Sequence, residues 1–198
     1  MDTIEINGRT FNVDIVTDDS HGAPWQEEAG HGPVTDWTRS AKRPGEVAIA
    51  SDRGFHRYYD FQEACQIARR DGWGWLPGRL VVDRFAHSGA HKWRARVERR
   101  PDLVAYGRDQ NVAIATLYAM HRATMSPKAY AAGAALCDMD RMRGWCDGTW
   151  CYVGVVVTRE DTGASESLWG IESDAEDYLE EVARDLAHEI IAAEQAAS

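Results

Sequence analysis

Residues 150–158 read WCYVGVVVT and residues 166–171 read ESLWGI, with a turn-forming sequence between them. Their aromatic and β-branched side chains suit a pleated, half-buried surface, so they predict the two strands of a β-hairpin. Apolar residues then recur at steps of three and four over 179–190, as on the buried face of a helix. Ser173 stands three residues before Glu176, which is the spacing of a capping box. The sequence therefore predicts a hairpin followed by a helix that Ser173 caps.

Two more hairpins are predicted nearer the N-terminus. Asn7-Gly8 separates two alternating segments within 3–15, and this pair is typical of a two-residue turn with positive φ at both positions. Residues 47–50 and 55–59 form a second strand–turn–strand pattern. Asp60 then has the position of a helix N-cap, and the helix is expected to end at Gly72.

The remaining segments give weaker patterns. Glycine and proline interrupt any period over 17–45, and Trp25 and Trp37 are expected to anchor this irregular stretch in the core. Beyond it we predict two strands, 79–85 and 92–97, and two helices, the first from Asp109 to His121 and the second from Ser126-Pro127 to Arg143, closed by Gly144. The second helix is expected to turn Ala132, Ala135, Leu136, Met139 and Met142 inward.

Together these elements define a fold class. Strands and helices occur in blocks rather than in alternation, which predicts an α+β fold: an antiparallel sheet built from β-hairpins, with about four helices packed mainly on one face. A chain of 198 residues with 44% hydrophobic residues fits a single globular domain over 1–198. Residues 75–108 could form a basic inserted hairpin subdomain. The chain has no run of about 18 apolar residues and no signal-peptide pattern, so we expect a cytoplasmic protein without a membrane partner.

Charge is distributed unevenly along the chain. The net charge is -10, and residues 160–198 carry twelve acidic residues against one arginine. Residues 79–108 carry eight basic residues against three acidic ones. The excess of acidic residues argues against direct nucleic-acid binding by the whole protein. Opposite charges in two segments suit attraction to a charged partner, or head-to-tail self-association in a homo-oligomer.

Residues 143–157, RGWCDGTWCYVGVVV, and residues 166–173, ESLWGIES, resemble a group of small uncharacterised proteins from tailed bacteriophages and prophages. The similarity extends to three further motifs and to one motif of related phage proteins: DDSHGAPW at 18–25, DRG at 52–54, YYDFQEA at 58–64 and FAHSG at 85–89. Residues from Trp75 to about Ala135 depart from the shorter members. The resemblance implies a phage accessory protein in the cytoplasm of the bacterial host, and it assigns no catalytic residue.

Two histidines offer an alternative function. His21 and His31 stand ten residues apart in the glycine-rich loop, with Asp18, Asp19, Glu27, Glu28 and Asp36 nearby. Imidazole and carboxylate groups bind divalent metals, so the loop could serve a small metal-binding or ligand-binding enzyme. The spacing matches no established metal site, and the chain has neither a nucleophile elbow nor a phosphate-binding loop. We therefore expect no cofactor, no metal and no catalytic activity.

The function predicted from these observations is non-catalytic binding to a host protein. Countering a host defence system, as an anti-CRISPR or anti-restriction inhibitor, is its most specific form. The expected binding residues are the outward carboxylates of the C-terminal helix: Glu176, Asp177, Glu180, Glu181, Asp185 and Glu189. The expected basic patch consists of Arg79, Arg84, Lys92, Arg94, Arg96, Arg99 and Arg100.

Overall fold

The computed structural model describes residues 3–27, 30–86 and 89–196, and it has the predicted α+β fold with antiparallel strand pairs throughout. Its contacts divide the chain into two compact units. Unit 1 combines residues 1–27 with 144–198, and unit 2 is the segment 28–143 between them. The sequence predicted one domain. The predicted basic subdomain, 75–108, corresponds to a three-stranded sheet inside unit 2.

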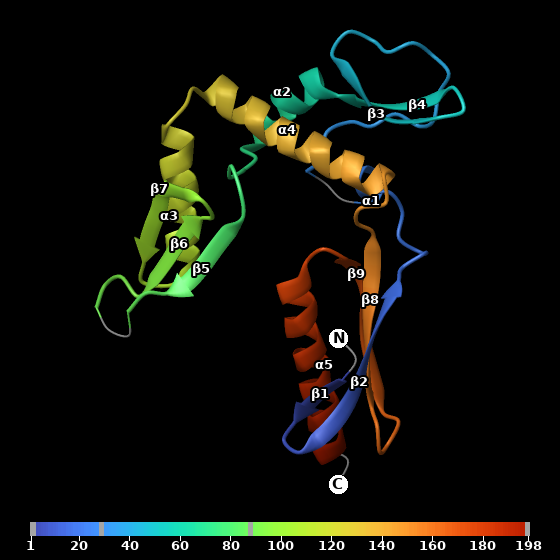
Figure 1. Cartoon of the computed structure of the whole chain (residues 1–198), viewed down its shortest axis with the longest axis vertical. Coiled ribbons are helices and arrows are strands. Elements are labelled where there is room, and N and C mark those ends of the chain that lie inside the picture. The colour runs from blue at the N-terminus through green and yellow to red at the C-terminus, as the bar shows by residue number, and fades with distance from the viewer. Residues whose placement is uncertain (1–2, 28–29, 87–88, 197–198) are drawn as a thin grey trace. The chain divides into compact units, whose positions relative to one another are not determined.

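Unit 1 is a four-stranded sheet with one long helix on it (Figure 1). The strand order is β1-β2-β8-β9, so the N-terminal hairpin pairs with the predicted C-terminal hairpin through β2 and β8. Asn7 and Gly8 have φ of 53° and 72°, as the predicted hairpin turn requires. The elements are β1 (Thr3–Ile6), β2 (Arg9–Thr17), the short α1 (Pro24–Glu27), β8 (Tyr152–Arg159), β9 (Ser165–Glu172) and α5 (Glu176–Ala196).

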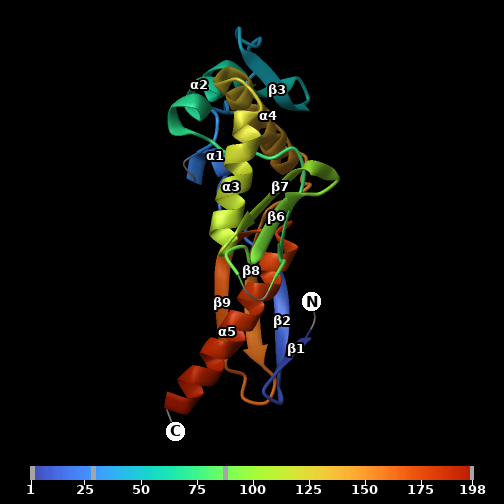
Figure 2. The ribbon, with the colours of Figure 1, turned by 90° about the vertical axis from the view of Figure 1, so that its left-hand side faces the viewer.

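The core of unit 1 lies between this sheet and α5, which crosses it in Figure 2. Alternate residues of β8, Val153, Val155 and Val157, face the helix and are at most 5% exposed. The helix contributes the predicted apolar stripe. Its buried members are Leu179, Val182, Ala183, Leu186, Ala187, Ile190 and Ile191. Apolar residues that recur every second position on the strands and about every 3.6 positions on the helix therefore pack in one core.

The predicted capping box at Ser173 is wrong. Helix α5 begins at Glu176, and the carbonyl of Ala175 accepts the first helical hydrogen bond, from the N–H of Leu179 at 2.9 Å. The Ser173 hydroxyl instead accepts a hydrogen bond from the Cys151 N–H at 3.0 Å. The backbone of Cys151, immediately before β8, thus binds a side chain that the local sequence assigned to the helix.

Unit 2 contains two further antiparallel sheets and three helices. Strands β3 (Glu46–Asp52) and β4 (Phe55–Asp60) form one hairpin, followed by α2 (Phe61–Asp71). Strands β5 (Leu80–Arg84), β6 (Trp93–Val97) and β7 (Arg100–Gly107) form the other sheet, on which α3 (Gln110–Ala123) packs. Helix α4 (Pro127–Cys146) follows, and its last three residues belong to unit 1. The predicted single sheet is therefore three sheets.

Helix starts in unit 2 match the sequence well. Asp60 accepts a hydrogen bond from the Glu63 N–H at 2.9 Å, and Asp109 accepts one from the Val112 N–H at 2.9 Å. Gly72 ends α2 with φ of 71°. Short polar side chains before an apolar period thus locate the helix starts correctly.

Three expectations in this part of the chain are wrong. Trp37 is 43% exposed, with the Arg57 guanidinium over its ring at 5.1 Å, so it does not anchor the loop in the core. Leu136 is 48% exposed, although Ala135, Met139 and Met142 of the same predicted stripe are buried. Gly144 does not end α4, which continues to Cys146.

Candidate functional site: a groove beside helix α5

The six predicted binding carboxylates on α5 are all exposed, yet they do not share one face. A helix turns about 100° per residue, so Glu176 and Glu180 lie one above the other, and Asp185 lies on the opposite side of the helix axis. Glu176 and Glu180 border the buried stripe on the side of β2. The remaining carboxylates, Asp177, Glu181, Asp185 and Glu189, point elsewhere around the solvent-exposed surface. The structure therefore singles out two of the six.

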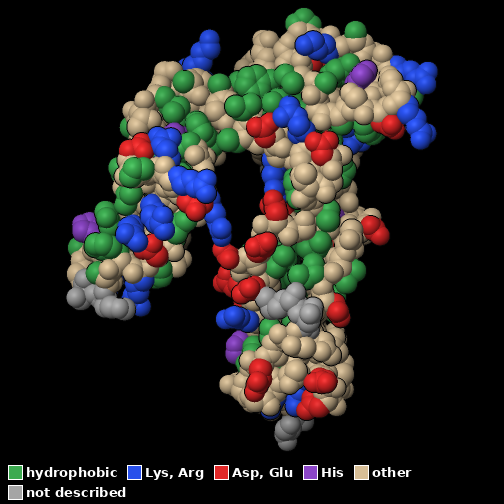
Figure 3. Space-filling model, in the orientation of Figure 1, with side chains coloured by type: hydrophobic (Ala, Val, Ile, Leu, Met, Phe, Trp, Pro, Cys, Tyr) green, Lys and Arg blue, Asp and Glu red, His purple; other side chains and the backbone are tan. Residues whose placement is uncertain are grey.

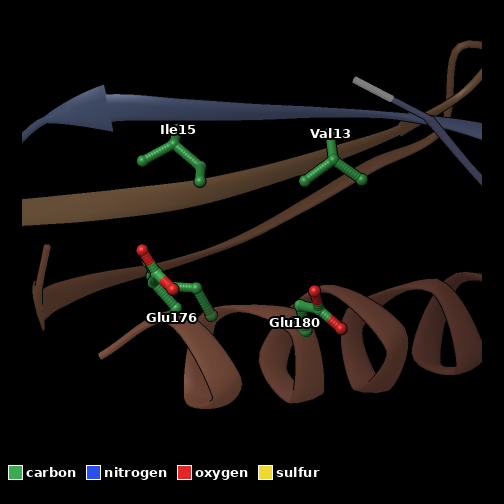
Figure 4. A pocket seen from close by; sticks show the side chains of 5 residues that line it. Val13, Ile15, Glu176 and Glu180 are labelled. Carbon is green, nitrogen blue, oxygen red and sulfur yellow. The ribbon is translucent and has the colours of Figure 1, made fainter. Parts of the chain in front are cut away.

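Glu176 and Glu180 line a groove of about 200 Å³ between α5 and β2, called here the α5 groove. Its other lining residues are Val13, Ile15 and Leu179. Val13 and Ile15 alternate along β2, so their side chains point to the same face and toward the helix, as Figure 4 shows. The α5 groove therefore has an apolar floor and two carboxylates along one side.

The carboxylates of the groove have few cationic neighbours. Glu180 lies 3.8 Å from Arg184 across one helical turn, and both side chains are more than half exposed, so this pair contributes little binding energy. Glu176 makes no ion pair with any residue that the structure describes. Figure 3 shows acidic side chains gathered along α5 on the visible face. The site is thus negative, partly apolar and accessible.

The floor of the groove belongs to a strand with an open edge. Strand β1 pairs with β2 only from Arg9 to Asn12, whereas β8 pairs with β2 on its other side from Phe11 to Thr17. Figure 1 shows β1 lying beside only the lower part of β2. Ile15 is 44% exposed and Val16 is 43% exposed. In the described part of the chain, the outer edge of β2 from Ile15 to Thr17 has no strand partner.

A buried carboxylate supports the loop that follows β2. Asp18 is 7% exposed and accepts hydrogen bonds from the Ser20 hydroxyl at 2.6 Å, the Ser20 N–H at 3.1 Å and the Gly170 N–H at 3.2 Å. The hydrogen bond from the Ser20 side chain is the main cause that lowers the pKa of Asp18. His21 lies 3.9 Å from the same carboxylate and packs on the Tyr152 ring at 4.1 Å.

This arrangement predicts how acid affects unit 1. Because the folded-state pKa of Asp18 is lowered, its ionised form adds stability above the unfolded pKa of about 3.9. That stability is lost as the pH falls through the folded-state pKa. We expect Asp18→Asn to destabilise unit 1 most at neutral pH and progressively less below about pH 4, in urea unfolding measured from pH 3 to 7. For Ser20→Ala, the free energy of unfolding should change with pH less steeply than in wild type and more steeply than in Asp18→Asn. If the free energies of unfolding of wild type and Asp18→Asn differed by the same amount at every pH, ionised Asp18 would not be the source of this stability.

His31 belongs to a second, separate carboxylate network in unit 2. Its Nδ1 lies 2.6 Å from Asp138 Oδ1, while Asp138 Oδ2 accepts hydrogen bonds from the Gly32 N–H at 2.8 Å and the Tyr59 hydroxyl at 2.6 Å. Tyr59 is fully buried, and this burial is the main cause that raises its pKa. The network ties the loop around His31 to strand β4 and helix α4.

The two histidines of the alternative metal or ligand site contact different carboxylates. His21 lies beside Asp18, and His31 lies beside Asp138. Among the described residues, no three His, Cys, Asp or Glu side chains gather as metal ligands would. Glu28 and the side chain of Glu27, which the sequence placed near this loop, lie outside the described residues.

The predicted basic patch is only partly assembled. Arg94, Arg96, Arg99 and Arg100 line one depression of about 400 Å³ on the β5–β7 sheet, and Arg79, Arg84 and Lys92 are not among its lining residues. Three of the four lie beside carboxylates, and Arg96 Nε is 3.7 Å from the Asp83 carboxylate. Arg94 binds Asp83 through contacts of 3.0 and 2.8 Å, and Arg100 binds Asp102 through contacts of 2.9 and 2.7 Å. These ion pairs reduce the positive potential of the patch.

Comparisons with protein-family models, with curated proteins and with solved structures found no match to this chain. The resemblance to phage proteins therefore stays a prediction. Within the residues described, no helix is both long and apolar enough to cross a membrane. The α5 groove and the open edge of β2 beside it form the candidate binding site.

Proposed function

We propose that this protein is a non-catalytic binding protein whose α5 groove receives a basic segment of another protein. The observation that carries the proposal is the coincidence of an apolar floor, Val13 and Ile15, with the two carboxylates Glu176 and Glu180. Lysine and arginine side chains have an apolar stem and a charged end, so they suit such a surface. The acidic surroundings on α5 would accelerate encounter with a positive partner.

The partner in this proposal is a protein of the bacterial host, in line with the phage resemblance. Inhibition of a host defence protein, of the anti-CRISPR or anti-restriction type, is the most specific form of the proposal. Proteins that handle nucleic acid carry basic surfaces, and the two groove carboxylates, Glu176 and Glu180, can bind a basic side chain of such a surface in place of a phosphate. Electrostatic complementarity also selects among partners, because like charges opposite each other are costly.

Charge reversal at the groove tests this proposal. The tagged full chain is incubated with bacterial lysate, and the proteins retained by wild type are compared with those retained by Glu176→Lys/Glu180→Lys. We expect at least a tenfold loss of the specific partner, since each close charge pair is worth about 1 kcal/mol or more at an interface.

The matched control is Asp185→Lys/Glu189→Lys, which changes the net charge by the same amount on α5 but away from the groove. This variant should retain the partner to within about twofold, because long-range attraction is screened at physiological salt. Equal losses for both variants would contradict a groove-specific site. No loss for either would contradict the proposal itself.

A further inference from the structure

The open edge of β2 has the backbone groups of a strand-binding site. The Asp18 N–H donates to Tyr152 on β8 at 2.9 Å, and the Thr10 carbonyl accepts from Glu160 at 3.1 Å. Even-numbered residues of β2 therefore direct their backbone groups toward β8. Backbone direction alternates along an antiparallel strand, so Ile15 and Thr17 direct their N–H and C=O groups to the outer edge. Among the described residues, none forms a backbone hydrogen bond with these outward groups.

Among the residues that the structure describes, nothing gives this edge the usual protection against strand pairing. Native sheets shield exposed edges with proline, lysine, bulges or a covering segment. Ile15, Val16 and Thr17 are three β-branched residues without a charge among them, and the pairing of β2 with β8 is regular from Phe11 to Thr17. The edge is therefore uncharged, free of bulges and suited to pairing with an extended chain.

We propose that the partner adds an extended strand to β2 at Ile15–Thr17 and places a lysine or arginine side chain in the α5 groove. This inference rests on the proposed function and specifies its mode of binding. A strand added to β2 lies about 4.8 Å away, and its residue beside Ile15 has its side chain on the same face as Ile15. That face is the one toward α5, where Glu176 and Glu180 lie.

The edge of β2 and the α5 groove contribute differently to binding. Backbone hydrogen bonds along the edge of β2 hold any extended chain and give affinity without sequence selectivity. The α5 groove selects the side chain: the stem of a lysine or arginine covers Ile15, and its cation reaches the carboxylates. The next residue along the partner strand points to the opposite face, next to Val16, where a β-branched side chain fits. The preferred ligand is thus an alternating cationic and β-branched segment.

A peptide selection tests this mode. A library of random ten-residue peptides is selected against the full chain, and the recovered peptides are synthesised and measured by fluorescence anisotropy. We expect alternating lysine or arginine and β-branched residues. Thr17→Pro, which removes one outward N–H but no hydrogen bond to β8, should weaken binding about tenfold. Thr17→Val, which keeps the N–H, should bind within twofold of wild type.

A second measurement avoids any effect of a variant on folding. Peptides methylated at alternate backbone nitrogens keep their charge but lose the donors on one edge, so wild-type protein should bind one methylated register and not the other. Recovery of no peptide would overturn the inference. Binding that survives Thr17→Pro and both methylated registers would also overturn it, and if that binding were still lost in Glu176→Lys/Glu180→Lys, the proposed function would stand without strand addition.

The occupant could instead be a second copy of this chain. In that case sedimentation would show an increase in mass with protein concentration that Glu176→Lys/Glu180→Lys abolishes. That result would overturn the assignment of the edge to a foreign strand. If the sedimentation mass stays constant over the protein concentrations used for the peptide measurements, the result supports binding of a foreign strand.

Discussion

Replacing Asp138 with alanine is expected to lower the free energy of unfolding of unit 2 by about 3 kcal/mol. The Asp138 carboxylate accepts hydrogen bonds from the fully buried Tyr59 hydroxyl and from the Gly32 N–H, and it contacts His31. A buried donor that loses its acceptor costs about 1–3 kcal/mol. Tyr59 keeps a longer hydrogen bond of 3.3 Å to the Ala135 carbonyl, which offsets part of its loss.

Urea unfolding followed by tryptophan fluorescence measures this effect, with circular dichroism as a second probe of two-state behaviour. Tyr59→Phe is the matched variant, because it removes the hydroxyl donor together with its need for an acceptor. It should cost less than Asp138→Ala, about 1 kcal/mol. The double variant should be less destabilised than the sum of the two, since both act on one network. Strict additivity would show that Asp138 and Tyr59 do not depend on each other.

Gly107→Ala should also be strongly destabilising, by about 3 kcal/mol or more. A Cβ atom at Gly107 would lie 2.4 Å from the Ala113 backbone nitrogen and 2.9 Å from the Asp109 carbonyl oxygen. Both atoms belong to the backbone at the start of α3, so no side-chain rotation relieves the overlap. The strand and the helix that follows it would have to separate at the centre of the unit 2 core around Ala113 and Leu117.

The control for Gly107 is Gly148→Ala. Gly148 has φ of 69° and no atom within 4 Å of an added Cβ, so the substitution costs only backbone strain, about 1 kcal/mol. Thermal unfolding of the two variants under identical conditions separates the contributions of overlap and strain. If Gly107→Ala and Gly148→Ala lowered the stability of the protein equally, α3 would be able to shift away from β7 at little cost in free energy.

Features set by neighbours in sequence were predictable. The turn at Asn7-Gly8, the cap at Asp60, the start of a helix near Asp109 and the apolar stripe of α5 each depend on a few adjacent residues. Strand β7 was missed because Arg100, Pro101 and Asp102 break its strand pattern. Its place at the edge of the three-stranded sheet tolerates that composition, since an edge strand needs partners on one side only.

Features set by distant pairing were not predictable. The acidity and exposure of Glu176 and Glu180 follow from the sequence alone, but the α5 groove exists only because β2 lies alongside the helix, with Val13 opposite Val157. Local pattern also failed at Ser173 and Trp37, whose surroundings come from other elements. Sequence thus indicated which residues carry charge, and tertiary structure decided which of them share a site.

The discontinuity of unit 1 has a consequence for synthesis on the ribosome. Strands β1 and β2 leave the exit tunnel early, yet their partner β8 is translated only after the whole of unit 2. An isolated two-stranded hairpin is marginally stable in water. Until β8 arrives, the apolar face of β2 with Phe11, Val13 and Ile15 has no core to enter, and a nascent chain in that state is a substrate for chaperones. Folding of unit 1 therefore depends on the segment that follows unit 2, because that segment supplies the strand that pairs with β2.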